Sequence, residues 1–506
     1  MADDLGFNDV SYRGSNEMGT YNIDSLAYNG IILDNFHAPP LCTPSRSAFM
    51  TGKHPYRLGM QHFVVPSDEP WGLGTKEKIM PQYFKEAGYI TRLIGKWHLG
   101  FYQKQYTPTQ RGFDSFFGYL GPYIDYFDFT LKMFDRNFSR GYDMRNNLDV
   151  FNTTLPQYAT ELFTKEAVKV ITNHDKKNPL FLMVNHLAPH AGNEDFPMQA
   201  KKEDIARFNY IKDETRRILG GMIYQLDQSV GDIVKALSDA NMLKDTIIVF
   251  YSDNGGPTVG LHSTAASNFP LRSQKQTAFE GGIRTNAFIY SSSLPKSTIR
   301  RGLFDVSDLL PTLNTLSGAN FKIQGKIDGL DQSLTLKYNF KSPRNELLTV
   351  DDVLGYSSYI FYGLKIVNGS STNGKSDGFL GSNNNSDYDI KNYIKNVRNS
   401  RVSTYLKNSM SDYGIERLRE SIKVQCSNSV HKNPCDLLKA PCLFDLNNDP
   451  CEENNIAEKY PIIFKPLFSR YKNALTSIVQ TRRKPSDPQC DPANFNFTWN
   501  WWQQDS

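Results

Sequence analysis

The chain has 506 residues, which is too long for one small core and favours two domains. Hydrophobic residues make up 39% of it and charged residues 22%, as in ordinary folded proteins. The net charge of +4 comes from 57 basic and 53 acidic residues, a balance too weak to indicate a nucleic-acid-binding protein. No apolar run is long enough to cross a bilayer, so we predict no transmembrane segment.

From its start to about residue 345 the chain alternates helical and strand-like segments. Apolar periodicity predicts helices over 81–87, 158–172 and 214–240, and buried strands over 89–95, 179–186 and 246–253. Helices that alternate with continuous apolar strands indicate an α/β domain, built on a mostly parallel sheet that helices cover on both faces. In such sheets ligands bind beyond the carboxyl ends of the strands, so the polar residues that follow the strands are candidate site residues.

Beyond residue 345 the composition changes, and we predict a catalytic domain over 1–345 and a smaller α+β domain over 346–506. The stretch "SSYIFYGLKIVNG" predicts a strand pair, the Gly-, Ser- and Asn-rich stretch 369–396 a mobile surface loop, and 456–474 a helix. Five cysteines fall in this part: Cys426, Cys435, Cys442, Cys451 and Cys490. Their spacing favours disulfides over zinc ligands, and their odd number leaves one without a partner in this cluster.

Five N-x-[ST] sequons accompany these cysteines, at Asn137, Asn152, Asn368, Asn384 and Asn496. Sequons arise by chance in Asn-rich chains, but together with a disulfide cluster they point to the secretory pathway. We therefore expect a lysosomal or secreted glycoprotein.

Cys42 is the only cysteine before Cys426 and lies in "LCTPSRSAFMTGK", residues 41–53. Thr43 or its neighbour can cap a helix whose first turn contains Pro44. Cys42 and Arg46, four residues apart, then share one side of a helix start, where free amides attract anions. The pattern describes an anion site that contains a nucleophile, although a capped helix with a buried cysteine is the commoner explanation of so short a motif.

Two acidic pairs could supply a metal site. Asp3 and Asp4 lie in "ADDLG", while Asp253 and Asn254 follow the strand "TIIVFY". Three carboxylates and an amide oxygen form an oxygen-only set that suits Ca2+ or Mg2+ better than zinc. The alternative for either pair alone is an ordinary turn or cap.

Three further segments offer cationic groups near strand ends. Lys96 and His98 are two residues apart at the end of a predicted strand, so their side chains would share one face. An ammonium and an imidazole placed together suit anion binding and activation of a hydroxyl. The alternative is a solvated edge of the sheet. His190 follows the strand "PLFLMVNH", whereas His186 lies within it and is expected in the core. Lys275 lies in a loop, where a lone lysine is usually solvated. We assign no role to the other histidines, which are His37, His54, His62, His174, His262 and His431.

"CTPSRSAFMTGK" resembles the signature of the type I sulfatases, C-x-P-S-R followed by Leu/Met-Thr-Gly. Further segments occur in the order of that family: "ADDLG", "KEAGY", "GKWHLG", "SDNGG", "EGG.R" and "LFDL..DP.E.NN". The likeness is closest to the arylsulfatase B, or N-acetylgalactosamine 4-sulfatase, group. It implies an alkaline-phosphatase-like α/β fold with a smaller C-terminal domain, hydrolysis of sulfate esters, and conversion of Cys42 to formylglycine by the formylglycine-generating enzyme.

The resemblance also implies roles for the candidate residues. The formylglycine hydrate at position 42 carries two hydroxyls; one attacks the sulfur, and the other drives release of sulfate as the aldehyde re-forms. Asp3, Asp4, Asp253 and Asn254, with residue 42, would hold one Ca2+. Five residues would cradle the sulfate: Arg46, Lys96, His98, His190 and Lys275. His98 would assist the hydrate and His190 would lie near the leaving group.

The chain departs from the family pattern at its start and at the partner of Cys490. The family has a signal peptide and an apolar strand before the Asp pair, which Met1 nearly abuts here, so we expect the complete protein to carry both. The family's usual partner of Cys490 is missing. We expect a sulfated sugar such as N-acetylgalactosamine 4-sulfate or an aryl sulfate as substrate. Alternatives are another sulfated small molecule such as a plant glucoside sulfate, or a non-hydrolysing relative that binds sulfated glycans; Cys42 and the oxygen-only set disfavour a phosphodiesterase.

Overall fold

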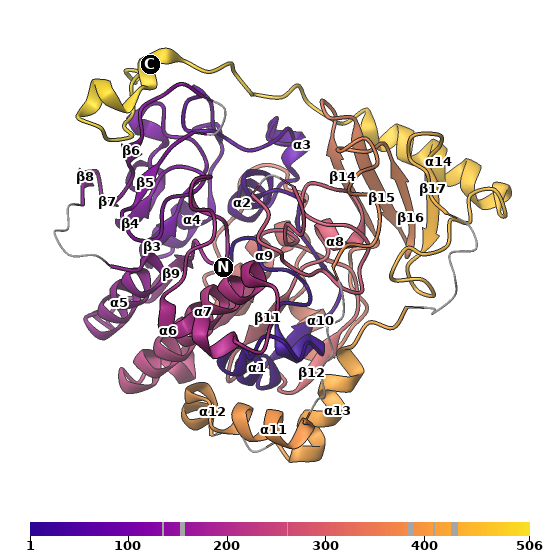
Figure 1. The fold of residues 1–506 in the computed structure, drawn as a ribbon, viewed down its shortest axis with the longest axis horizontal. Coiled ribbons are helices and arrows are strands. Elements are labelled where there is room, and N and C mark those ends of the chain that lie inside the picture. Colours follow the sequence, from indigo (N-terminus) through magenta and orange to yellow (C-terminus); the bar gives the residue numbers. More distant parts are fainter. Residues whose placement is uncertain are drawn as a thin grey trace.

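The computed structural model describes residues 1–133, 136–151, 157–260, 262–381, 389–407, 410–426 and 434–505. A five-stranded sheet of order β8-β7-β4-β3-β9 lies on one side of the larger part of the molecule (Figure 1). Strand β3 (Ile90–Lys96) lies between β4 (Ser115–Tyr119) and β9 (Leu180–Asn185) and runs parallel to both. The short strands β7 (Arg145–Asn146) and β8 (Asp149–Val150) extend it in antiparallel fashion.

A second sheet of order β10-β11-β1-β12 adjoins the first. It consists of β10 (Ile248–Tyr251), β11 (Ala287–Tyr290), β1 (Ile31–Leu33) and β12 (Thr298–Arg300). Here β1 and β12 are parallel, while β11 is antiparallel to both β10 and β1, so the two sheets together are mixed. Helices flank them, as predicted: α4 (Met80–Glu86), α5 (Ala159–Thr172), α7 (Glu214–Asp239), α1 (Tyr21–Tyr28) and α9 (Leu309–Ser317).

The first residues of the chain lie between these two sheets. The Met1 amino group donates to the Val184 carbonyl oxygen at 2.9 Å, and the Ala2 amide donates to the Tyr251 carbonyl oxygen at 2.9 Å. A cavity of about 700 Å³ lies beside Met1, lined by β9, β10 and the helices that cover them. This arrangement carries Asp3 and Asp4 to the carboxyl ends of β9 and β10. The expectation of an additional apolar strand before the Asp pair stays a prediction.

An antiparallel sheet follows residue 345 and packs against α14 (Pro461–Leu475), as Figure 1 shows. Its strands are β14 (Glu346–Asp351), β15 (Tyr356–Phe361), β16 (Leu364–Asn368) and β17 (Cys442–Asp445). The predicted strand pair is confirmed as β15 and β16. Disulfides join Cys426 to Cys451 and Cys435 to Cys442, while Cys490 and Cys42 remain free.

Two predictions for this part differ from the structure. The predicted loop over 369–396 overlaps helix α11 (Ile390–Arg398), in which Asp389 caps the first turn and Tyr393, Ile394 and Val397 are buried. The final helix begins at Pro461 rather than residue 456, because the Ile456 amide donates to the Leu443 carbonyl oxygen beside β17.

Contacts cross the predicted domain boundary at residue 345. Helices α11 and α12 (Arg401–Leu406) pack against α1, and α12 also packs against α7, while α13 (Asp412–Ile422) packs against α11. Near the other end, Trp499 is fully buried and its indole nitrogen donates to the Leu131 carbonyl oxygen at 2.9 Å. The division into two domains stays a prediction, and these segments contact the larger part directly.

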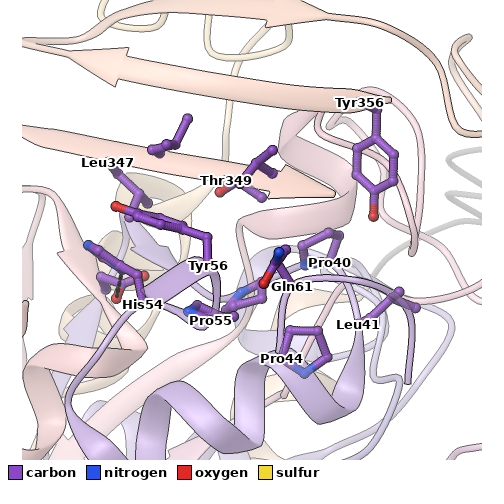
Figure 2. A pocket seen from close by; sticks show the side chains of 14 residues that line it. Pro40, Leu41, Pro44, His54, Pro55, Tyr56, Gln61, Leu347, Thr349 and Tyr356 are labelled. Atoms are coloured by element: carbon purple, nitrogen blue, oxygen red, sulfur yellow. Dashed lines mark ion pairs between the residues drawn. The ribbon is translucent and has the colours of Figure 1, made fainter. Parts of the chain in front are cut away.

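The antiparallel sheet also contacts the region around α2 (Cys42–Thr51) and α3 (Pro55–Leu58). Figure 2 shows Leu347 and Thr349 of β14 facing Tyr56, with Pro44 of α2 on the far side of a cavity of about 20 Å³. The His54 and Tyr56 rings stack in this wall at a centroid distance of 5.2 Å. The predicted site residues do not line this cavity. The contact packs the antiparallel sheet against the first turn of α2.

The remaining elements are short. They are β2 (Phe36–His37), β5 (Thr130–Leu131), β6 (Gly141–Tyr142), α6 (Lys202–Ile205), α8 (Glu280–Ile283), β13 (Phe304–Asp305), α10 (Ser333–Tyr338) and, among the described residues, eight 3-10 turns. None of the helices within the described ranges is both long enough and apolar enough to span a bilayer.

Candidate active site

The carboxyl ends of three strands meet beside the start of α2. Lys96 is the last residue of β3, His190 follows β9, and Asp253 with Asn254 follows β10. Parallel strands that end at one edge bring their following residues together. The structure therefore gathers the ten predicted residues around Asp3 and Asp4, at the edge of the sheets where the sequence places a site.

Cys42 is the first residue of α2 and is 1% exposed. Leu41 occupies the N-cap position with extended backbone, so neither Thr43 nor Cys42 caps the helix as expected. Thr43 instead donates from Oγ1 to the His98 carbonyl oxygen at 3.1 Å. The Cys42 Sγ lies 3.4 Å from Asp3 Oδ1. Burial raises the pKa of the Cys42 thiol well above its usual range, so the unmodified side chain is a weak nucleophile.

Three buried carboxylates face three permanent cations. Lys96 Nζ lies 2.6 Å from Asp3 Oδ2, and Arg46 Nη2 lies 2.9 Å from Asp253 Oδ2. Lys275 comes from the loop before α8 and places its Nζ 2.7 Å from the Asp4 carboxylate. The formal charges of these six groups cancel, which allows all of them to be buried together.

The pKa values of the carboxyl groups respond to these neighbours. Burial would raise the pKa of Asp4, but the charge of Lys275 and the hydrogen bonds from Lys275 and Asn254 hold it below its usual range. Burial and the adjacent Asp3 raise the pKa of Asp253 to about 6, even though Arg46 opposes that shift. Crowded carboxylates of this kind are typical of sites that accept a further cation.

Several potential ligand atoms lie close together here. Those of Asp3, Asp4, Cys42 and His190 all lie within 4.8 Å of one another, and in that group only the two carboxylates are hard oxygen donors. Asn254 donates from Nδ2 to Asp4 Oδ1 at 2.6 Å, while its buried Oδ1 has no hydrogen-bond partner among the described residues. An unsatisfied amide oxygen beside three carboxylates suits Ca2+ or Mg2+. Because the protein charges already cancel, such an ion would give the site the positive charge that an anionic substrate requires.

Two histidines border this cluster. His98 has a positive φ of 59°, and both of its ring nitrogens are buried without a partner in the described part of the chain. Burial and the charge of Lys96 lower its pKa well below its usual value, so its imidazole is neutral. Burial likewise lowers the pKa of His190 to about 3. His190 Nδ1 lies 2.6 Å from the Ala191 carbonyl oxygen and must donate to it, which leaves Nε2 as an acceptor facing Asp4.

Other histidines show what the sequence could and could not assign. His186 is buried, with Nε2 2.9 Å from Ser229 Oγ, so its core placement is confirmed. No role is predicted for His262, but its ring lies 5.9 Å from that of His190 and 4.9 Å from that of Tyr123. Tyr123 and His262 lie in loops without apolar periodicity, so the spacing of residues in the sequence does not indicate that they lie near His190.

Comparisons with known proteins agree with this site. Arylsulfatase J of Mus musculus is 33% identical over 511 aligned positions, which cover 100% of this chain and 80% of that protein. N-acetylgalactosamine-6-sulfatase of Homo sapiens is 26% identical and covers 99% of this chain and 88% of its own length. The crystal structure of Ps i-CgsB in complex with k-i-k-neocarrahexaose superposes with a TM-score of 0.73 at 26% identity, covering 95% of this chain and 93% of that one.

The Sulfatase family matches residues 1–319, which include all ten residues gathered at the strand ends. The alignment with the mouse relative covers the whole chain and so extends beyond the residues that match the family. The fold, the clustered side chains and the match coincide, and the chain therefore belongs to the sulfatase family, with an alkaline-phosphatase-like fold.

Proposed function

We propose that this sulfatase hydrolyses the sulfate ester of a sugar, using a formylglycine formed from Cys42 and one Ca2+. The observation that carries the proposal is the placement of Cys42, with its Sγ 3.4 Å from Asp3 Oδ1 and its pKa raised by burial. A protonated thiol in that position cannot serve as a strong nucleophile. Its oxidation to an aldehyde, whose hydrate offers hydroxyl groups, would give this position a reactive group.

The surrounding residues suit the binding of a sulfate group. Arg46, Lys96 and Lys275 converge from three separate segments, and each can neutralise a sulfate oxygen once a metal ion engages the carboxylates. Asp3, Asp4, Asp253 and Asn254 would hold that Ca2+, which supplies positive charge next to the ester. The neutral imidazole of His98 can accept a proton from a hydroxyl at position 42. His190, beside Asp4, would lie near the departing alcohol.

Related proteins support a sugar as the alcohol part. One relative is an N-acetylgalactosamine-6-sulfatase, and one solved relative is bound to neocarrahexaose. We extend this to a sulfated N-acetylgalactosamine-type substrate, with aryl sulfates as accepted analogues. The closer likeness to N-acetylgalactosamine 4-sulfatases remains part of the proposal.

We also place the protein in the secretory pathway, either secreted or lysosomal, where the formylglycine-generating enzyme would convert Cys42. The two disulfides support this placement. Among the sequons, Asn137 and Asn496 are exposed and could carry glycans, while Asn368 is half-buried and donates to Tyr471 Oη at 3.2 Å. Asn152 and Asn384 lie outside the described residues.

A substrate panel tests the proposal. Protein expressed together with a formylglycine-generating enzyme is assayed on 4-nitrophenyl sulfate and on N-acetylgalactosamine 4-sulfate and 6-sulfate, and the peptide around Cys42 is analysed by mass spectrometry. We expect release of sulfate from at least one sugar, in proportion to the converted fraction. A fully converted protein that binds these sugars without releasing sulfate would indicate a non-hydrolysing relative instead.

A further inference from the structure

Three aromatic rings form a wall that starts at His190 and leads away from the cluster of charges. The Tyr123 and His190 rings are stacked, with centroids 5.9 Å apart and planes 18° from parallel. His262 completes the wall, 4.9 Å from the Tyr123 ring at an interplanar angle of 52°. Tyr123 and His190 are buried, whereas His262 is half-buried and is therefore the ring of the three that is accessible to solvent.

The segment that carries His262 is fixed to the sulfate-binding loop. The Gln274 side-chain oxygen accepts from the Thr258 and Val259 amides, both at 2.8 Å, and its Nε2 donates to the Val259 carbonyl oxygen at 2.9 Å. Gln274 directly precedes Lys275. His262 is therefore held in register with a residue that we assign to the sulfate, and the distance between the two is set by the fold.

The rings also have a defined chemical character. Burial and the charge of Lys275 lower the pKa of His262 to about 3, which makes its imidazole neutral at the pH of either compartment. A neutral imidazole offers one donor and one acceptor. Tyr123 is held in place by the hydrogen bond from its Oη to the Lys132 carbonyl oxygen at 3.0 Å, so it can support the His262 ring.

We propose that His262 determines substrate specificity by hydrogen-bonding to a ring hydroxyl of the sugar in the leaving alcohol, while the buried Tyr123 ring, packed against both His190 and His262, fixes the position of the His262 ring. This rests on the proposed function, because it takes the alcohol side of the sulfate to be where His190 lies. A simple aryl group has no hydroxyl for His262. The wall thus favours sulfated sugars over aryl sulfates.

The test compares His262→Ala with the unaltered protein on N-acetylgalactosamine sulfate and on 4-nitrophenyl sulfate. We expect kcat/KM for the sugar to fall about tenfold more than that for the aryl sulfate, mostly through KM, as loss of a hydrogen bond and its packing implies. His262→Gln, which keeps a donor and an acceptor, should recover part of the sugar activity. His174→Ala, in a histidine of the segment after α5, is the matched control and should leave both values unchanged.

Two results would overturn the inference, and they are distinguishable. If the unaltered, fully converted protein releases sulfate from neither substrate, the proposed function fails and this inference fails with it. If that protein is active but His262→Ala lowers both substrates equally, the proposed function stands and His262 has no part in choosing the sugar. Thermal unfolding of each variant shows that the compared proteins are equally folded.

Discussion

Cys42 Sγ lies 3.4 Å from Asp3 Oδ1, and Lys96 Nζ lies 2.6 Å from the other oxygen of the same carboxylate. Asp3 therefore connects the residue proposed for modification, the lysine proposed to bind sulfate and the proposed metal ligands. A change in the charge of one of these groups alters the electrostatic potential at the others.

Replacing Cys42 by serine should abolish turnover while preserving the fold. Serine is close in size to cysteine and can hydrogen-bond to Asp3, so unfolding temperature should change little. A serine ester of sulfate has no second hydroxyl on the same carbon to release it, so steady-state activity on 4-nitrophenyl sulfate should fall more than about a thousandfold. Ordinary turnover by this variant would refute the formylglycine mechanism.

Cys490 provides the matched control for that experiment. It is the other free cysteine and is also buried, but it lies in a 3-10 turn near the C-terminal end. Cys490→Ser should keep turnover near that of the unaltered protein, because its thiol touches none of the ten site residues among the contacts described. Equal losses in both variants would point to a general effect of removing thiols.

Removal of the metal should inactivate the protein reversibly. We expect activity to be lost in chelator and restored by Ca2+. Because an ion that binds only the folded state stabilises it, the free energy of unfolding should rise by about 2.7 kcal/mol when free Ca2+ is about 100 times its Kd. Asp253→Asn should weaken both effects, since it removes one carboxylate charge. Indifference of activity and unfolding temperature to chelator would contradict the metal assignment.

Much of this site could be predicted from the sequence, and the reason is positional. Asp253 follows an apolar strand closely, His190 lies a few residues beyond another, and Cys42 starts a helix marked by Pro44, so periodicity and turn chemistry locate them. His262 lies in a loop whose path depends on hydrogen bonds to the side chain of Gln274. Spacing alone cannot reveal contacts of that kind.

The errors in the fold have similar physical causes. The predicted loop over 369–396 includes most of α11, which is rich in Asn, Lys and Arg, yet its few apolar residues are buried and the helix packs against α1. Tertiary burial, rather than local propensity, stabilises that helix. The predicted final helix over 456–474 starts too early, because Pro461 lies in the first turn of the observed helix and marks its start.

A buried ion cluster joins the antiparallel sheet to the loop that bears Lys275. Lys365 Nζ of β16 lies 2.8 Å from Glu280 Oε1 of α8 and 2.7 Å from Glu452 Oε1. Lys365→Met would leave two buried carboxylates facing each other, so the free energy of unfolding, measured in urea, should fall by about 3–5 kcal/mol. Lys439→Met removes an exposed pair with Asp436 and should leave the free energy of unfolding almost unchanged, because water and salt screen that pair. Similar small losses in both variants would show that the cluster adds no stability.

Asp227 in α7 should make stability fall as the pH rises. It is buried and accepts hydrogen bonds from the Asn22 side chain and the Ile23 amide, both at 2.9 Å. Burial raises its pKa to about 7, above the value of 3.8 for an exposed aspartate. The folded state therefore keeps a proton that the unfolded state loses between these two values, so this group's contribution is complete below the lower value and declines towards the higher one.

The Asp227 effect can be isolated with a single substitution. Across the window from about pH 4 to about pH 7, this one group lowers the free energy of unfolding by at most about 1.4 kcal/mol per pH unit. Asp227→Asn removes the titrating proton, so urea unfolding of this variant should show a shallower decline over that window than the unaltered protein. Asp245→Asn, at an exposed position, should leave the slope unchanged. A variant whose stability tracks that of the unaltered protein at every pH would mean that Asp227 does not hold its proton in the folded state.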